Sequence, residues 1–395
     1  MPYKIDRIDD FGRGITKVED TICFVSNALE NEEVDIEIID KKSKCMEAKS
    51  TAIIKESQNR KEALCPYYLS CGGCNIMHMT YTHQLEFKKS KVERILSKFA
   101  NISNVVECII PTQEFNYRNK VVLKVLNGKI GFYKDRSNDL VNIDMCLLCS
   151  NKINEVIDKL KSINLNGVNE VLIRSNYKDE SLIALTGLNI EDLKDKLDFV
   201  DNIVINDKVV KGNGYLIDKI GQYLFKVSYD SFFQVNSIGV NLLYDEVFKN
   251  VGNNDTILDL YCGAGTIGMY LSKNANKIYG VEINKSAIED ANYNMKLNNV
   301  TNMEFLCSDV ALIKNKYKNV DLVVIDPPRS GLSKEAIKNV LDINSNRIIY
   351  VSCDPVTLAR DLNILKENYD VKNVKVVDMF PNTYHVECVC LLMKK

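Results

Sequence analysis

The chain has 395 residues, and 46% of them are hydrophobic, which is enough for two or three domains with sizeable cores. Its formal net charge of −2 excludes a strongly basic protein that binds nucleic acid through overall charge, so any RNA contact must come from local patches or base-specific binding. No stretch approaches the ~20 apolar residues of a membrane helix, and the N-terminus lacks the apolar core of a signal peptide, so we expect a cytoplasmic protein with no membrane contact.

Residues 1–57 carry a pattern typical of β-structure. Short apolar or alternating segments, separated by turn-forming residues, recur at residues 5–8, 22–25, 34–39 and 51–54. Short strands at such regular spacing predict a small barrel. Through residue 60 the chain has ten Lys or Arg and thirteen Asp or Glu, so this region is not basic, and a generic β domain is the alternative interpretation.

Cysteine spacing after this region indicates a metal site. Thirteen cysteines in a chain without secretory features favour metal-binding or catalytic roles over disulfides. Cys65, Cys71 and Cys74 fall within ten residues, and the last two flank a glycine pair that lets the backbone wrap closely. A fourth ligand is expected from Cys146 or Cys149, and four thiolates fit either zinc or an iron–sulfur cluster. The alternative is a set of free thiols around a tight turn.

Residues 58–231 mix helical and strand patterns. Apolar positions at helical spacing predict a helix over 84–99, whose basic surface can either contact phosphates or face solvent. The basic residues of this helix are Lys88, Lys89, Lys91, Arg94 and Lys98. An Asn-Gly turn between strands at 121–125 and 129–133 predicts a β-hairpin. The remaining expected elements of this α+β region are a helix at 151–162 and strands at 170–175 and 181–186.

After residue 231, strand and helix patterns alternate, which predicts a doubly wound parallel sheet. The expected strands are at 256–260, 277–281, 303–306, 320–325 and 347–351. The expected helices are at 237–250, 266–273, 285–298, 333–341 and 355–367. Two further strands are expected at 371–379 and 387–393.

The first strand–helix turn of this region has the composition of a nucleotide-binding loop. Asp259 ends a strand, and Gly263 and Gly265 follow before a helix begins, which allows close backbone approach to a ligand. Glu282 ends the next strand, where a carboxylate hydrogen-bonds ribose hydroxyls, and Asp309 follows the third strand, where adenine is usually met. Together these positions predict a methyltransferase that uses S-adenosylmethionine.

The next two strand ends indicate the atom that is methylated. Asp326 begins an Asp-Pro-Pro sequence, which marks methyltransferases that act on nitrogenous bases, and Arg329 follows where exocyclic-nitrogen enzymes have an aromatic residue. Cys353 follows a buried strand, and ligands of open α/β sheets lie outside such strand ends. This combination favours carbon methylation. Because free cysteine is among the most buried residue types, an inert core thiol is the alternative for Cys353.

Methylation of a pyrimidine at C5 needs a nucleophile and a base. C5 of uracil reacts poorly with a sulfonium methyl group until a thiolate adds at C6 and converts the ring to an enolate. A base must then remove the C5 proton so that the thiolate can leave. Cys353 can supply the thiolate, and His385 and Glu387 are the two candidate bases before the last strand.

At these motifs the chain resembles the RNA uracil-C5 methyltransferase family. The matching segments are residues 231–236, 259–265, 326–329, 352–361 and 380–387, and the resemblance covers essentially the whole chain. It implies an α/β Rossmann-like methyltransferase domain at 232–395 and a small N-terminal OB-like β-barrel, the TRAM domain, at 1–57. It also implies an α+β central domain at 58–231 with a [4Fe-4S] cluster, in which residues 77–108 can pack on the methyltransferase domain.

The resemblance also assigns roles to residues. It makes Cys353 the nucleophile and Glu387 the base. The residues that it places in contact with S-adenosylmethionine or uracil are Gln234, Tyr261, Glu282 and Asp326. Thr266 and Asp309 stand where some relatives carry Asn, and we assign them to cofactor contact. The cluster ligands that it implies are Cys65, Cys71, Cys74 and Cys146, with Cys149 as an extra thiol.

The expected function is therefore S-adenosylmethionine-dependent methylation of uridine C5 in RNA by a monomeric enzyme. The cluster motif favours 23S ribosomal RNA as the substrate, and a tRNA 5-methyluridine methyltransferase is the alternative. A different RNA-base methyltransferase on the same scaffold, such as an N-methyltransferase, is a second alternative. A non-catalytic RNA-binding protein stabilised by a cluster is a third.

Overall fold

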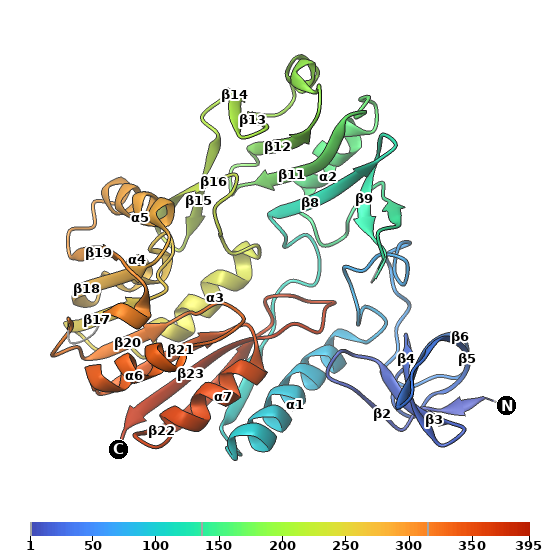
Figure 1. Ribbon diagram of the computed structural model, residues 1–395, viewed down its shortest axis with the longest axis horizontal. Coiled ribbons are helices and arrows are strands. Elements are labelled where there is room, and N and C mark those ends of the chain that lie inside the picture. Colours follow the sequence, from blue (N-terminus) through green and yellow to red (C-terminus); the bar gives the residue numbers. More distant parts are fainter. Residues whose placement is uncertain (1, 136, 314–315) are drawn as a thin grey trace.

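The computed structural model describes residues 2–135, 137–313 and 316–395. In Figure 1 the N-terminal strands lie at the lower right, a central sheet lies at the top and a large mixed sheet lies at the lower left. Four sheets are present in the described residues, and each of the three larger ones has its own hydrophobic core. No helix in these parts of the chain is both long and apolar enough to cross a membrane.

The N-terminal sheet has six strands in the order β1-β5-β6-β4-β3-β2. Their bounds are β1 (Tyr3–Lys4), β2 (Arg7–Ile8), β3 (Gly14–Val18), β4 (Thr21–Ser26), β5 (Glu33–Lys41) and β6 (Cys45–Lys55). Of the strand expected at 5–8, only Arg7 and Ile8 belong to a strand, β2. The backbone N–H of Ile5 donates to the carbonyl of Glu32, and the backbone N–H of Asp6 donates to the carbonyl of Ile15. Strand β3 was not predicted, because its first residue is a glycine that follows turn-forming residues.

The central sheet has seven strands in the order β10-β9-β8-β11-β12-β13-β14. Their bounds are β8 (Lys120–Leu126), β9 (Lys129–Tyr133), β10 (Leu140–Asn142), β11 (Val168–Ser175), β12 (Ser181–Gly187), β13 (Asn202–Ile205) and β14 (Lys208–Lys211). Helix α2 (Asn151–Leu160) contacts β11 and β12, and a short 3-10 helix spans Glu191–Lys196. The predicted hairpin turn is confirmed: Asn127 and Gly128 both have positive φ, 52° and 72°, as a two-residue turn of this type requires.

The large sheet has eight strands in the order β19-β18-β17-β20-β21-β23-β22-β7. Their bounds are β7 (Val106–Ile110), β17 (Asp255–Leu260), β18 (Ala275–Glu282), β19 (Met303–Cys307), β20 (Leu322–Ile325), β21 (Arg347–Ser352), β22 (Tyr369–Val377) and β23 (Glu387–Lys394). The five strands from β19 to β21 are parallel, as predicted. The prediction of a wholly parallel sheet is wrong beyond them, because β23 enters the sheet antiparallel to both β21 and β22.

Helices cover both faces of this sheet. The helices are α1 (Tyr81–Ala100), α3 (Ser237–Phe248), α4 (Thr266–Leu271), α5 (Lys285–Leu297), α6 (Lys334–Ile343) and α7 (Pro355–Leu365). One core joins α1, α6 and α7 to the strands, and the other core joins α3 and α4 to them. The hairpin of β15 (Tyr215–Ile220) and β16 (Tyr223–Ser228) packs beside α3, α4 and α5.

Two elements from the first third of the chain complete the large sheet. Strand β7 pairs in parallel with β22 at the edge, and α1 packs on α7. The Nζ of Lys366 donates to the carbonyl of Ala100 at 2.6 Å. Strand β7 was not predicted from the sequence. The prediction that the basic residues of α1 face solvent or phosphate is wrong for Lys88 and Lys91, which are 0% and 6% exposed.

The packing of α1 leads to a stability prediction. Leu96 is fully buried in the same core as the sheet, whereas Phe99 on the same helix is 48% exposed. Leu96→Ala should lower the free energy of unfolding by about 2–5 kcal/mol, because it removes buried methyl groups and leaves a cavity. Phe99→Ala should change it by less than about 1 kcal/mol. Urea denaturation followed by circular dichroism measures both, and equal effects would contradict this packing.

Candidate active site

The strand ends of the large sheet bring several predicted site residues to one edge. Strands β17, β18, β19 and β20 are parallel, so the residues that follow them meet on the same side of the sheet. These residues are Tyr261 after β17, Glu282 at the end of β18, Asp309 after β19 and Asp326 after β20. Thr266 begins α4 directly after the first of these loops. The five predicted residues therefore lie along one edge.

The loop after β17 has a backbone shape that leaves space for a ligand. Tyr261 and Gly263 have positive φ, 62° and 52°, and a β-carbon at Gly263 would have no atom within 4 Å. The carboxylate of Glu282 accepts hydrogen bonds from the backbone N–H of Gly263 at 3.2 Å and of Asn284 at 2.8 Å. The loop is therefore open toward the sheet edge, and its acid is already oriented.

Two buried contacts hold this loop; the sequence motif includes Asp259 without giving it a contact role, and Tyr244 was not predicted. The Oδ2 atom of Asp259 accepts from the backbone N–H of Gly268 at 3.0 Å, and burial raises the pKa of Asp259 to about 8. The hydroxyls of Tyr244 and Thr266 share a hydrogen bond of 2.7 Å. The strand-end position of Asp259 is a signal in the sequence, whereas no sequence pattern links Tyr244 to Thr266.

Asp309 begins a short 3-10 helix after β19. Its Oδ1 atom accepts from the backbone N–H of Ala311 at 2.8 Å. Burial and then the charge of Asp309 raise the pKa of Tyr261 to about 12. Ile283 and Leu312 are 65% and 73% exposed on the loops that follow β18 and β19. This mixture of apolar surface and carboxylates fits a flat heterocycle with polar edges.

The antiparallel ladder between β21 and β23 brings Cys353 and Glu387 to the same end of two paired strands. In this ladder Val351 pairs with Val389 and Ser352 with Cys388, which is its last pair. Cys353 therefore follows β21 beside Glu387, the first residue of β23. Cys353 is half-buried, and Glu387 is 3% exposed. The thiol and the carboxyl predicted to act together are therefore neighbours.

The turn that carries Cys353 is fixed by the start of α7. The Oδ1 atom of Asp354 accepts from the backbone N–H groups of Val356 and Thr357, each at 2.9 Å, and Pro355 occupies the first helical turn. The hydroxyl of Ser352 accepts from the backbone N–H of Asp354 at 3.2 Å. A proline and a capped helix thus hold the backbone on the C-terminal side of the thiol.

Burial and like charge raise the pKa of three groups at this point. Burial raises the pKa of Asp326 to about 7. Burial and then the charges of Glu387 and Asp326 raise the pKa of Cys353 to about 11. Burial and then Asp326 raise the pKa of Glu387 well above its ordinary value. The charge of Arg329 lowers the pKa of both Cys353 and Glu387 and so opposes these shifts in part. A carboxylate with a raised pKa is a good proton acceptor.

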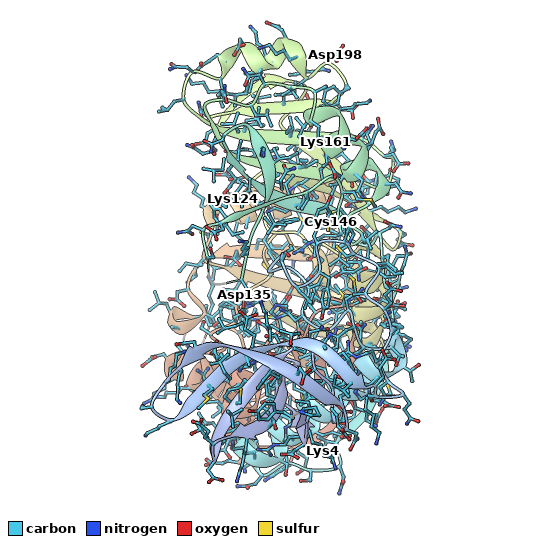
Figure 2. The ribbon with its side chains drawn as sticks, turned by 90° about the vertical axis from the view of Figure 1, so that its right-hand side faces the viewer. Lys4, Lys124, Asp135, Cys146, Lys161 and Asp198 are labelled. Atoms are coloured by element: carbon cyan, nitrogen blue, oxygen red, sulfur yellow. The ribbon has the colours of Figure 1, made fainter. Side chains whose placement is uncertain are left out.

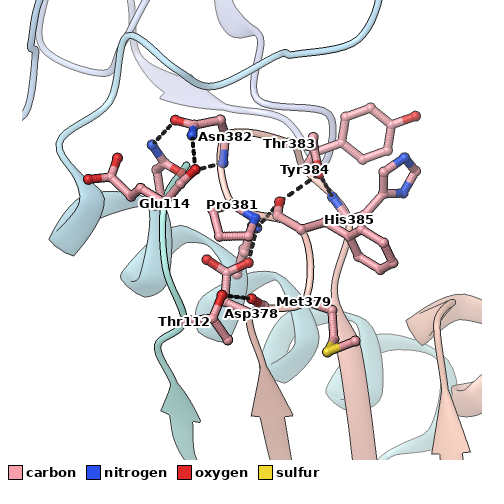
Figure 3. Close-up of polar contacts among 12 residues, drawn as sticks. Thr112, Glu114, Asp378, Met379, Pro381, Asn382, Thr383, Tyr384 and His385 are labelled. Carbon is pink, nitrogen blue, oxygen red and sulfur yellow. Dashed lines mark hydrogen bonds and ion pairs between the residues drawn. The ribbon is translucent and has the colours of Figure 1, made fainter. Parts of the chain in front are cut away.

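His385, the other candidate base, is stacked within the loop before β23. Its ring centroid lies 4.4 Å from that of Tyr384 and 6.0 Å from that of Phe380, and Figure 3 shows it pointing away from Asp378 and Asn382. Burial and then nearby cationic side chains, Arg329 first, lower the pKa of His385 to about 4. This shift favours the neutral imidazole, and His385 lies two residues before Glu387, where β23 begins.

Gln234, another predicted contact residue, lies just before α3 and is held by the segment before β8. It is 9% exposed, and its carbonyl accepts from Asn119 Nδ2 at 3.1 Å. Asn119 also donates from its backbone N–H to Val235 at 2.9 Å and from Nδ2 to Ser237 Oγ at 3.1 Å. The segment before β8 therefore fixes the backbone of Gln234, a role for Asn119 that no motif indicates.

Four of the predicted cluster cysteines line one cavity of about 50 Å³ in the central region. They are Cys65, Cys71, Cys74 and Cys146, together with apolar side chains and Arg118. Cys146 is labelled in Figure 2, where it lies between the N-terminal sheet, marked by Lys4, and the far end of the central sheet, marked by Asp198. In the described parts of the chain, no group of three or more His, Cys, Asp or Glu is arranged to hold a metal ion, and all thirteen cysteines are free.

Cys146 and Cys149 have different environments. Cys149 is fully buried in the core of the central sheet, whereas Cys146 lines the cavity. A hydrogen bond from Cys149 is the main reason that the pKa of Cys146 is lowered to about 6. Asn154 fixes the backbone of Cys146, accepting from its N–H at 2.9 Å and donating to its carbonyl at 3.0 Å. Of the two, Cys146 is the thiol that faces the other three.

The raised pKa of Cys353 can be tested by alkylation. With iodoacetamide, Cys353 should react slowly at neutral pH, and its rate should rise toward pH 11 as the thiolate forms. Glu387→Gln should shift this profile to lower pH because it removes a repelling charge, and Arg329→Met should shift it to higher pH. Mass spectrometry of the Cys353 peptide measures the rate, with exposed Cys108 as the internal control. Identical profiles in all three proteins would contradict the charge arrangement.

Comparison with known proteins agrees with this arrangement. The family model described as tRNA (Uracil-5-)-methyltransferase matches residues 198–395. An uncharacterized RNA methyltransferase of Clostridium acetobutylicum is 35% identical, with 98% of this chain and 96% of the relative covered, and one of Bacillus cereus is 33% identical, with 96% and 94% covered. The crystal structure of Pyrococcus abyssi tRNA (uracil-54, C5)-methyltransferase in complex with S-adenosyl-L-homocysteine superposes with a TM-score of 0.83 over all of both chains, at 27% identity. The chain therefore belongs to the RNA uracil-C5 methyltransferase family, whose members are S-adenosylmethionine-dependent RNA methyltransferases.

Proposed function

We propose that this enzyme methylates C5 of a uridine in 23S ribosomal RNA through a covalent adduct between Cys353 and C6 of the base. The observation that carries the proposal is the β21–β23 register, which sets a thiol and a buried carboxyl side by side at the carboxyl edge of the sheet. Asp326 and Arg329 act electrostatically on the same two groups. An N-methyltransferase would have no use for this pairing.

S-adenosylmethionine would bind along the strand-end residues. Its role is to supply an electrophilic methyl group. In this proposal Glu282 accepts hydrogen bonds from the ribose hydroxyls, and Asp309 receives the adenine edge between the exposed side chains of Ile283 and Leu312. Tyr261, Thr266, Asp326 and Gln234 complete the contacts to the donor or to uracil. The open space at Gly263 supports this placement.

The reaction then follows from the two neighbouring groups. The Cys353 thiolate adds to C6, and the electron pair of the C5=C6 bond moves toward the C4 carbonyl to give an enolate. C5 of this enolate would attack the methyl carbon, and the methyl–sulfur bond of S-adenosylmethionine would break to release S-adenosylhomocysteine. C5 then carries both a proton and the new methyl group. The Glu387 carboxylate takes that proton, the C5–H electron pair re-forms the C5=C6 bond, and the C6–S bond breaks to release the Cys353 thiolate. The raised pKa of Glu387 suits it to this step.

The same four cysteines would hold a [4Fe-4S] cluster. Their side chains line one cavity, and each iron of such a cluster takes its own thiolate, so the sulfurs need not converge on one point. A zinc site needs four ligands about 2.0–2.3 Å from a single ion, which the arrangement of the thiols fits less well. Cys65, Cys71, Cys74 and Cys146 are the proposed ligands, and the resemblance of this motif to ribosomal-RNA enzymes favours 23S rRNA as the substrate.

We further propose three domains in a monomeric, cytoplasmic enzyme. Residues 1–57 form an OB-like TRAM barrel. The strand order supports this assignment, because β1 and β2 follow each other in the chain but stand at opposite ends of the N-terminal sheet, as when a sheet curls toward closure. Residues 58–231 form the central domain, and residues 232–395 form the methyltransferase domain. Residues 77–108 belong with the methyltransferase core, as the packing of α1 and the pairing of β7 support.

The proposed activity can be tested with purified enzyme, S-adenosylmethionine, and transcripts of 23S rRNA and tRNA. Nucleoside mass spectrometry should detect 5-methyluridine in the ribosomal transcript. Cys353→Ala should lower the rate by at least about 10³-fold because it removes the nucleophile, whereas Cys108→Ala should retain activity. The solved relative is named a tRNA enzyme. Methylation of the tRNA transcript alone would contradict 23S rRNA as the substrate and support tRNA in its place. An N-methylated product would overturn the mechanism.

The proposed cluster can be tested by metal analysis after anaerobic purification. About four iron atoms and four acid-labile sulfides should be found per chain. Cys74→Ser and Cys146→Ser should lose iron, whereas Cys149→Ser should keep it because this thiol does not line the cavity. Stoichiometric zinc, or iron loss in the Cys149 variant alone, would contradict the proposed ligand set.

A further inference from the structure

The loop between β22 and β23, residues 378–386, leads directly into Glu387. Hydrogen bonds with other segments of the chain hold it at several positions. The Oγ1 of Thr112 donates to the carbonyl of Asp378 at 2.6 Å, and the hydroxyl of Tyr117 donates to that of Pro381 at 3.1 Å. Asn382 Nδ2 donates to the carbonyl of Glu114 at 2.9 Å. Figure 3 shows the contacts of Thr112 with Asp378 and of Glu114 with Asn382. The loop has no regular structure of its own, so its shape depends on these partners.

Helix α1 supplies the other side of this loop through a polar stripe. Gln84, Lys88 and Lys91 are spaced at i, i+4 and i+7, so they share one helix face, and they are 0%, 0% and 6% exposed. Gln84 exchanges two hydrogen bonds with Asn382: its Oε1 accepts from the backbone N–H at 2.8 Å, and its Nε2 donates to Oδ1 at 3.1 Å.

The two lysines hold the loop on either side of Asn382. The Nζ of Lys88 lies 2.5 Å from Asp378 Oδ1 and donates to the carbonyl of Phe380 at 2.9 Å. The Nζ of Lys91 donates to the carbonyl of Tyr384 at 3.0 Å and lies 5.0 Å from the centre of the Tyr384 ring. Burial lowers the pKa of Lys88, and burial lowers that of Lys91 to about 8. Apolar side chains at these positions would avoid the free-energy cost of desolvating a charge. They could not, however, donate hydrogen bonds that orient the backbone carbonyls of the loop.

We propose that the stripe formed by Gln84, Lys88 and Lys91 positions Glu387 for proton removal from C5. This inference rests on the proposed role of Glu387 as the base. Tyr384 is three residues before Glu387, and the stripe fixes the backbone at residues 380, 382 and 384. These three are positioning residues, because none of them lies opposite the thiol.

Loss of the stripe's hydrogen bonds should slow the elimination step much more than the addition of the Cys353 thiolate to C6. Cys353 is held by the Asp354 cap of α7. Although α1 packs on α7, the hydrogen bonds of Gln84, Lys88 and Lys91 go to the loop and not to this cap, so their loss should affect addition of the thiolate to C6 far less than elimination. Elimination requires the Glu387 carboxylate to reach the C5 proton, and small displacements of a catalytic group are costly. Loosening the loop should therefore leave the methylated base attached to Cys353 for longer.

The experiment is a single-turnover reaction with 23S rRNA transcript, in which the covalent complex is followed on denaturing gels. In Lys91→Met, the complex should form at a rate within about twofold of wild type and decay at least about tenfold more slowly. Lys91→Arg, which can still donate to Tyr384, should restore most of the decay rate. Lys89→Met is the matched control: this residue pairs with Glu93 on the helix surface and should leave the decay rate unchanged.

A second variant guards against simple loss of folding. Lys88→Met/Asp378→Leu replaces the buried ion pair with apolar groups, which is tolerated better than removal of one partner, and removes the bond to the carbonyl of Phe380. It should also accumulate the complex. Formation and decay falling together in both variants, or an unchanged decay rate in both, would overturn the inference. Glu387→Gln separates the two proposals: if it traps no complex, the proposed base itself is wrong.

Discussion

The antiparallel entry of β23 beside β21 is the constraint on which the site depends. A wholly parallel sheet would bring only loops and helix starts to its carboxyl edge. Because β23 runs antiparallel to β21, its first residue, Glu387, lies at the sheet edge where β21 ends and Cys353 follows. Strand β23 lies between β21 and β22. Its direction adds a carboxyl group beside the thiol at the same edge of the sheet that carries the other predicted site residues.

That placement has an electrostatic cost. Burial raises the pKa of Asp326, Cys353 and Glu387, so each is pushed toward its neutral form, and the charge of Arg329 offsets this in part for Cys353 and Glu387. In the proposed reaction a cationic methyl donor enters this acidic surrounding, and a positive charge there favours both thiolate and carboxylate. The site is thus suited to become reactive when the donor is present. The loop contacts from α1 serve the same end, because they fix the backbone that leads to Glu387.

Much of this was accessible from the sequence. The alternating strands and helices after residue 231 are where the pattern predicts them, since each combines clear periodicity with short turns. The acids at strand ends could be ordered along the sheet edge because parallel topology fixes where such ends meet. Resemblance to a family then favoured Glu387 over His385, a choice that stays a prediction, and Glu387 begins β23 at the end of the sheet where Cys353 follows β21.

Long-range pairings could not be predicted in this way. Strand β7 joins the large sheet through contacts with residues more than 260 positions away, and no local pattern reports such a partner. Lys88 and Lys91 follow the charge pattern of a surface helix, yet they are buried because carbonyls and an aspartate from the far end of the chain receive them. Asn119 and Tyr244 likewise take their roles from tertiary contacts alone.

The most direct measurement of the central claim is the identity of the residue that becomes attached to RNA. Fluorine at C5 of uridine permits addition of a thiolate and methyl transfer but leaves no proton for a base to remove, so elimination is blocked. Incubation of the enzyme with S-adenosylmethionine and 5-fluorouridine-containing RNA, followed by digestion and mass spectrometry, should yield a single peptide that carries a methylated nucleotide on Cys353. A methylated product without any covalent complex, or a nucleotide on another residue, would contradict the account.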